Sequence, residues 1–185
     1  MLVANFVQGQ SWCPPGAEWT FDLGSDVGSQ TGVVRVEYDG DTLINGSTAQ
    51  RLRQWAHVHE TGQTGYTTWP WGNLFTRSTQ DVVELYDPIT QEFDTLMWFA
   101  AQPGQHWTRS TFGGVTEQRI NVLGTSTVVV DGTPLRQLVV SGDPTFWFGS
   151  DTLLERIGFH TLYLRIEHTL SLDGGARSLY CYRDD

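Results

Sequence analysis

The feature that most constrains this chain is a period-two alternation of apolar and polar residues, interrupted by tight-turn signals. In VVRVEY (33–38) valine and tyrosine alternate with arginine and glutamate, as in a half-buried strand. A turn is expected at Asp39-Gly40-Asp41, and Asn45-Gly46 is a strong hairpin signal. The next strand is predicted from Ser47 to about Glu60. No window has sustained helical periodicity, so we expect at most one helical turn, near 151–156.

The same strand–turn–strand pattern recurs along the rest of the chain. It covers 81–99, 119–140 around Asp131-Gly132, and 156–182 around 173–175. Residues 40–52 and 127–138 resemble each other, which indicates a repeated hairpin. We therefore predict an all-β fold with little or no helix, in which a meandering antiparallel sheet of about ten strands closes into a barrel or sandwich. Without a linker or composition shift, residues 12–185 are predicted to form a single domain, after a leading segment or signal-peptide remnant at 1–11.

Charge excludes several classes of partner. The formal net charge is -10, and all 11 basic residues are Arg. Such a chain is repelled by phosphate backbones and anionic lipid surfaces, so we expect no nucleic-acid partner. No run approaches the ~18 apolar residues of a membrane-spanning helix, so no membrane insertion is expected. The absence of Lys removes Schiff-base chemistry.

A search for catalytic and metal-binding motifs finds none with the required spacing. G-x-S-x-G, P-loop, H-E-x-x-H and EF-hand patterns are absent, so we predict no enzyme and no cofactor. His57 and His59 are weak metal candidates, since residues two apart on a strand share a face about 6.6 Å apart. A third ligand would have to come from elsewhere, such as His160 or His168. A solvated histidine pair is the favoured interpretation.

Aromatic residues beside guanidinium groups give the best binding candidates. Arg51, Arg53 and Trp55 share one face of the strand predicted at 47–60, and Trp69-Pro70-Trp71 predicts a rigid aromatic turn. A second aromatic cluster is Phe146-Trp147-Phe148. Tryptophan flanked by donors suits stacking on sugar rings or packing on a protein partner, whereas the alternative is that these rings fill the interior. The candidate ligand-binding residues are Arg51, Arg53, Trp55, Trp69 and Trp71.

The two cysteines, Cys13 and Cys181, lie near opposite ends of the chain. The residues alone leave open whether they form a bond or remain two free, buried thiols. A bond closing so long a loop would contribute roughly 4–5 kcal/mol and would require an oxidising compartment.

Seven stretches in a fixed order carry a resemblance that spans nearly the whole chain. They are 12–19 (WCPPGAEW), 40–52, 84–96, 102–107, 130–138, 155–158 and 179–184. Together they resemble a family of secreted domains from Bacteroidota that precede a type IX secretion sorting domain. The resemblance implies secretion or a cell-surface location, a cleaved segment before Trp12, and a Cys13–Cys181 disulfide. These residues depart from the family at Ala49, where relatives often carry a further cysteine, and we expect no sorting domain within residues 1–185.

Three hypotheses for function follow, since the resemblance supplies no catalytic residues. The first is a non-catalytic extracellular or cell-surface module, adhesive or glycan-binding, whose partner is a glycan or a protein surface. The second is a structural subunit that self-assembles or packs on a neighbouring domain by strand addition, using exposed strand edges or the apolar segment 2–7. The third is a β-barrel carrier of a small apolar ligand.

Overall fold

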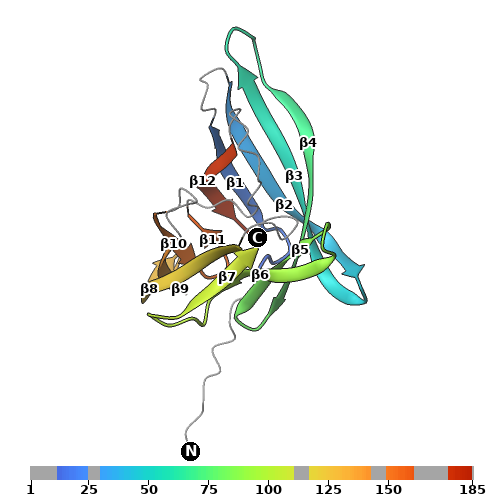
Figure 1. The fold of residues 1–185 in the computed structure, drawn as a ribbon. Coiled ribbons are helices and arrows are strands. Elements are labelled where there is room, and N and C mark those ends of the chain that lie inside the picture. Colours follow the sequence, from blue (N-terminus) through green and yellow to red (C-terminus); the bar gives the residue numbers. More distant parts are fainter. Residues whose placement is uncertain (1–11, 25–29, 111–116, 143–148, 161–174, 185) are drawn as a thin grey trace, which may run out of the picture.

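A computed structural model describes residues 12–24, 30–110, 117–142, 149–160 and 175–184, and these contain strands but no helix, which confirms the all-β class (Figure 1). The larger sheet consists of β1 (Glu18–Gly24), β2 (Gln30–Ile44), β3 (Ser47–Glu60), β4 (Thr67–Thr79), β5 (Val82–Asp87), β6 (Glu92–Trp98) and β12 (Gly175–Arg183). The smaller sheet consists of β7 (His106–Ser110), β8 (Glu117–Val130), β9 (Thr133–Ser141), β10 (Ser150–Leu154) and β11 (Gly158–Phe159).

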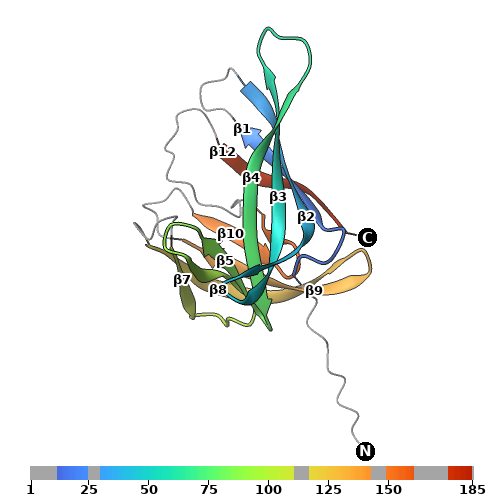
Figure 2. The same ribbon diagram turned by 90° about the vertical axis from the view of Figure 1, so that its right-hand side faces the viewer.

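The meander runs through two curled sheets instead of one. The seven-stranded sheet has the order β12-β1-β2-β3-β4-β5-β6, and the five-stranded sheet has the order β11-β10-β9-β8-β7, with antiparallel pairs throughout. The chain crosses between the sheets after β6, and β12 returns to pair with β1. Figure 2 shows the long strands of the larger sheet crossing in front of the smaller one. The predicted single sheet is thus split into two half-barrels that face each other.

Both halves of the predicted hairpin repeat are present. Ile44 pairs with Ser47 across the first turn, and Val130 pairs with Thr133 across the second. The intervening residues have positive φ: 51° and 78° at Asn45-Gly46, and 48° and 79° at Asp131-Gly132. Turns with two positive φ angles match the twist of the flanking strands, which is why Asn-Gly and Asp-Gly are favoured there.

Two local predictions were wrong. Asp39-Gly40-Asp41 does not reverse the chain, because β2 runs on to Ile44 with an irregularity in its register between Tyr38 and Asp41, where Gly40 has φ 95°. Trp69-Pro70-Trp71, predicted as a turn, lies within strand β4, where Trp69 and Pro70 pair with residues of β3. In both places pairing with a neighbouring strand outweighs the local turn signal.

The core lies between the two sheets, and Trp19 joins them directly. Trp19 is 0% exposed, and its Nε1 donates a 2.7 Å hydrogen bond to the carbonyl oxygen of Ile157, which follows β10 in the smaller sheet. Trp12 packs on Trp19 with ring centroids 5.2 Å apart, and its own Nε1 donates to Thr76 Oγ1. Gly158 lies against the Trp12 ring with φ 101°, a conformation that favours glycine.

Polar contacts also join the two sheets. Arg156 forms an ion pair with Asp184 at the end of β12, and Tyr182 Oη donates a 2.5 Å hydrogen bond to the same carboxylate. On another side, Arg136 of β9 donates to the Asp81 carboxylate at 3.0 Å and to the Phe99 carbonyl at 2.8 Å. These contacts fix the position of the smaller sheet relative to the larger one.

The disulfide implied by the resemblance is not formed in the structure. Cys13 is buried in the core cluster, while Cys181 is exposed, and both thiols are free. The pleat of β12 explains the difference: Tyr182 turns inward onto Trp19, with ring centroids 5.3 Å apart, so its neighbour Cys181 turns outward. The alternative of two buried thiols is therefore right for Cys13 alone.

We expect Trp19→Phe to destabilise the protein by about 2–4 kcal/mol, because it leaves the buried Ile157 carbonyl without its donor and opens a gap in the core. Urea denaturation measures the change. The matched control is Trp55→Phe on the half-exposed outer face, with an expected loss below about 1 kcal/mol. Equal losses in the two variants would contradict the role of Trp19.

The second prediction concerns pH. Burial, and secondarily the Asp41 carboxylate, raise the pKa of the Cys13 thiol well above its ordinary value. The folded thiol therefore stays protonated while an unfolded thiol ionises near pH 8.5, so this group's contribution to stability is complete below that pH and is lost as the pH rises above it. The stability difference between wild type and Cys13→Ala should fall by about 1–2 kcal/mol from pH 8 to pH 10. Urea denaturation under reducing conditions tests this, and a pH-independent difference would refute it.

Candidate functional site

Three of the five candidate binding residues lie together on the outer face of β3, the face turned away from the smaller sheet. Arg51, Arg53 and Trp55 are half-buried there, while the alternating residues Leu52 and Ala56 are buried on the inner face. The spacing read from the sequence therefore places these three side chains on one surface, as a regular strand requires.

Trp69 and Trp71 do not lie on that surface, so the structure does not bring the five candidate residues together. Trp69 pairs with the inward-facing Ala56, and cross-strand partners share a face, so Trp69 belongs to the inner side. Trp71 is the extra residue where the β3–β4 register shifts, and it packs against the core cluster. The following Gly72 has φ 112°. The register shift at this position could not be read from the Trp-Pro-Trp motif.

In their place, the outer face carries three rings that the sequence did not single out. Arg51 pairs with Phe75 on β4, and Tyr86 of β5 pairs with Phe93 of β6. The Phe75 and Tyr86 centroids are 6.5 Å apart at 82°, and those of Tyr86 and Phe93 are 5.2 Å apart at 53°. All three rings are half-buried. We call Phe75, Tyr86 and Phe93 the aromatic row. It runs across the adjacent strands β4, β5 and β6, and Arg51 of β3 lies beside its first ring, Phe75.

A positive charge caps one end of the aromatic row. The Arg77 guanidinium carbon lies 4.2 Å from the centre of the Phe93 ring, a cation–π distance. Arg77 also binds Glu84 through Nε at 2.6 Å and Nη2 at 3.1 Å, and this hydrogen-bonded pairing raises the pKa of Arg77. The two contacts hold Arg77 in one orientation over the row.

At the other end, two arginines share one carboxylate. Arg53 Nη2 donates to Asp39 Oδ2 at 2.6 Å, and Arg51 Nε lies 2.9 Å from the same oxygen. Arg51 Nη2 donates to the Asp39 carbonyl at 2.9 Å. The arginine side chains are 40% and 42% exposed. We call Arg51, Asp39 and Arg53 the Arg–Asp–Arg cluster; it places two guanidinium groups at the surface beside Phe75.

Trp55 occupies the next position along β3, and its polar group is already used within the sheet. Its Nε1 donates a 3.0 Å hydrogen bond to Glu37 Oε1. Glu37 is in turn 3.2 Å from Arg35, which forms a second ion pair of 2.5 Å with Glu18. The half-exposed ring, and not the indole N–H, is therefore what Trp55 can offer to a ligand.

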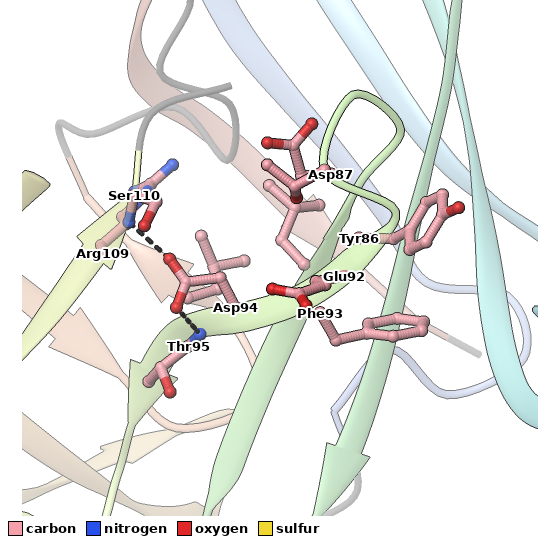
Figure 3. A pocket seen from close by; sticks show the side chains of 11 residues that line it. Tyr86, Asp87, Glu92, Phe93, Asp94, Thr95, Arg109 and Ser110 are labelled. Carbon is pink, nitrogen blue, oxygen red and sulfur yellow. Dashed lines mark hydrogen bonds between the residues drawn. The ribbon is translucent and has the colours of Figure 1, made fainter. Parts of the chain in front are cut away.

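A cleft of about 220 Å³ lies behind the aromatic row, on the inner side of the β5–β6 turn (Figure 3). Asp94 Oδ2 accepts a 2.5 Å hydrogen bond from the Ser110 amide of β7, and its Oδ1 accepts from the Thr95 amide at 2.9 Å. Arg109 is 3% exposed, and burial lowers its pKa to about 9 while the Asp94 charge opposes that shift. Asp94 thus bridges the edge strands β6 and β7, so the cleft lies where the edges of the two sheets meet. We call this junction, formed by Asp94, Arg109 and Ser110, the acidic seam.

The rings of the row are separated from this seam by the strand itself. Figure 3 shows the side chains of Tyr86 and Phe93 on one side of β5 and β6, and Asp94 with Arg109 on the other. Asp87 is also committed to local structure, since its Oδ1 accepts from the Ile89 amide at 2.8 Å. A ligand on the aromatic row would therefore not touch the acidic seam.

The histidine pair gains no support as a metal site. His57 Nδ1 is 2.9 Å from Thr68 Oγ1, and the His59 ring packs edge-on against Tyr66 at 5.5 Å. Within the described ranges, no three His, Cys, Asp or Glu side chains are grouped so that they could hold a metal ion. His168, the aromatic cluster 146–148 and the apolar segment 2–7 lie outside the described residues.

None of the residues that the structure describes forms a helix long and apolar enough to span a membrane. No family model, curated protein or solved structure matches this chain. The surface formed by the aromatic row and its arginines is therefore the basis for assigning a function.

Proposed function

We propose that this protein is a non-catalytic module, secreted or displayed at the cell surface, that binds glycans on the outer face of its larger sheet. The observation that carries the proposal is the aromatic row of Phe75, Tyr86 and Phe93, with guanidinium groups at both ends. The extracellular location rests on the resemblance to secreted Bacteroidota domains.

The chemistry of the aromatic row suits sugar rings. The C–H face of a pyranose is apolar and stacks on aromatic rings, while its hydroxyl groups need hydrogen-bond donors and acceptors at the edge. Arg51 and Arg53 supply donors at one end, and the Arg77–Glu84 pair supplies both kinds of group at the other. A purely apolar partner would leave these charged groups desolvated without compensation.

The aromatic row is also rigid before any ligand arrives. Its three rings stand on adjacent paired strands, and the β5–β6 register fixes Tyr86 opposite Phe93. Arg77 is held by two hydrogen bonds to Glu84 as well as by its contact with Phe93. Such preorganisation lowers the entropy cost of binding, so a shallow surface can still bind with useful affinity.

The other two hypotheses gain less support from the structure. A carrier of small apolar ligands needs an apolar cavity, whereas the described aromatic residues between the sheets pack on one another, as Trp12 does on Trp19. For strand addition, the edge strand β6 is already engaged by Ser110 and Trp107 of β7, through Asp94 Oδ2 and the Leu96 carbonyl.

We expect Tyr86→Ala to weaken glycan binding by about 5- to 30-fold, because stacking on an aromatic ring contributes on the order of 1–2 kcal/mol. A microarray of neutral and acidic oligosaccharides identifies a ligand, and calorimetry then compares wild type with Tyr86→Ala and Phe93→Ala. The matched control is Tyr180→Ala, which removes a tyrosine that is 81% exposed on β12, at the opposite edge of the sheet.

Thermal melts establish that all variants are folded. Binding unchanged in Tyr86→Ala and Phe93→Ala, or weakened equally in Tyr180→Ala, would refute the site. Release of new reducing ends from the bound glycan would refute the non-catalytic assignment.

A further inference from the structure

We infer that the glycan bound at this surface is anionic, and that the Arg–Asp–Arg cluster is the subsite for its carboxylate or sulfate group. This inference rests on the proposed function and adds the chemical class of the ligand. It follows from how positive charge is balanced along the outer face of the larger sheet.

The arginines of this face differ in how many carboxylates they contact. Arg77 is matched one to one by Glu84. Arg35 and Arg183 share Glu18, and Arg35 also contacts Glu37, so two carboxylates match these two arginines. Arg51 and Arg53, by contrast, share the single carboxylate of Asp39. The Arg–Asp–Arg cluster therefore carries a formal excess of one positive charge within a chain whose net charge is -10.

The cluster also keeps donor capacity for a ligand. A guanidinium has five N–H donors, and Asp39 is contacted by Nε and Nη2 of Arg51 and by Nη2 of Arg53. Both side chains are about two-fifths exposed, so their remaining N–H groups can reach a bound molecule. Guanidinium groups bind carboxylate and sulfate oxygens in a two-point geometry that a neutral hydroxyl cannot match.

Position links this charge to the aromatic row. Arg51 pairs directly with Phe75, and cross-strand partners lie about 5 Å apart on the same face. A sugar stacked on Phe75 would place an acidic substituent within reach of Arg51 and Arg53. A further carboxylate, Glu37, lies opposite Arg53 on β2, but it is bound to Arg35 and Trp55. Acidic groups more than about 8 Å away are screened at physiological salt, so the excess positive charge of the cluster sets the preference. A single arginine pair makes too few phosphate contacts for nucleic-acid binding.

Two matched pairs of oligosaccharides test the inference by calorimetry. One pair is hexagalacturonate and its full methyl ester, which removes the carboxylate charge. The other is a sulfated κ-carrageenan hexasaccharide and its desulfated form. We expect wild type to bind at least one acidic member about 10- to 100-fold more tightly than its neutral counterpart. The pair that shows the preference identifies carboxylate or sulfate as the ligand group.

The variants locate the preference. Arg51→Gln/Arg53→Gln should lose the preference, so that it binds the acidic members no more tightly than the neutral ones. Arg35→Gln, which removes an arginine of the same face that contacts two carboxylates, should keep the preference. Arg51→Lys/Arg53→Lys retains the charge but not the two-point geometry, and should keep only part of the preference.

The outcomes distinguish failure of the proposed function from failure of this inference. If wild type binds none of the array saccharides, the proposed function fails together with this inference. If it binds saccharides but shows no preference for the acidic members, the inference alone is overturned. It is also overturned if the double glutamine variant keeps the preference. Should that variant not fold, the wild-type comparison of acidic and neutral members still decides the matter.

Discussion

The hydrogen bond from Trp19 to the Ile157 carbonyl is the contact on which the rest of this architecture depends. It joins the first strand of the larger sheet to the smaller sheet through the centre of the core, where no water can substitute for either partner. Trp12 and Tyr182 pack around it, so both ends of the described chain meet at this point. With the two sheets held face to face, alternate side chains such as Leu52 and Leu74 of the larger sheet are buried in the core.

The burial of these side chains determines which residues form the outer face. Leu52 and Leu74 are buried between the sheets, so their neighbours Arg51 and Phe75 must face outward, and strand pairing sets them side by side. Repeated over β4, β5 and β6, the same alternation aligns three aromatic rings from three consecutive strands. The acidic seam around Asp94 and Arg109 lies behind them and holds the edge strands together. The position of the aromatic row thus follows from the packing of the core, and we propose that the row binds its ligand without rearrangement.

Alternation within single strands could be predicted from the sequence, but relations between strands could not. The faces of Arg51, Arg53 and Trp55 follow from period two, and the Asn45-Gly46 and Asp131-Gly132 hairpins follow from turn chemistry. The crossing between two sheets depends on long-range contacts such as Trp19 to Ile157. The register shift at Trp71 places Trp69 and Trp71 away from the surface of Trp55. The surface beside Phe75 depends on the pairing of Arg51 with Phe75, which no local sequence motif predicts.

The most direct test of a binding surface on this face is an amide NMR titration of ¹⁵N-labelled protein with the tightest saccharide found on the array. We expect the largest shift changes on β3 to β6, around Arg51, Phe75, Tyr86 and Phe93. Changes centred instead on the seam at Arg109, or on the exposed apolar residues Leu123 and Val139 of the smaller sheet, would contradict it.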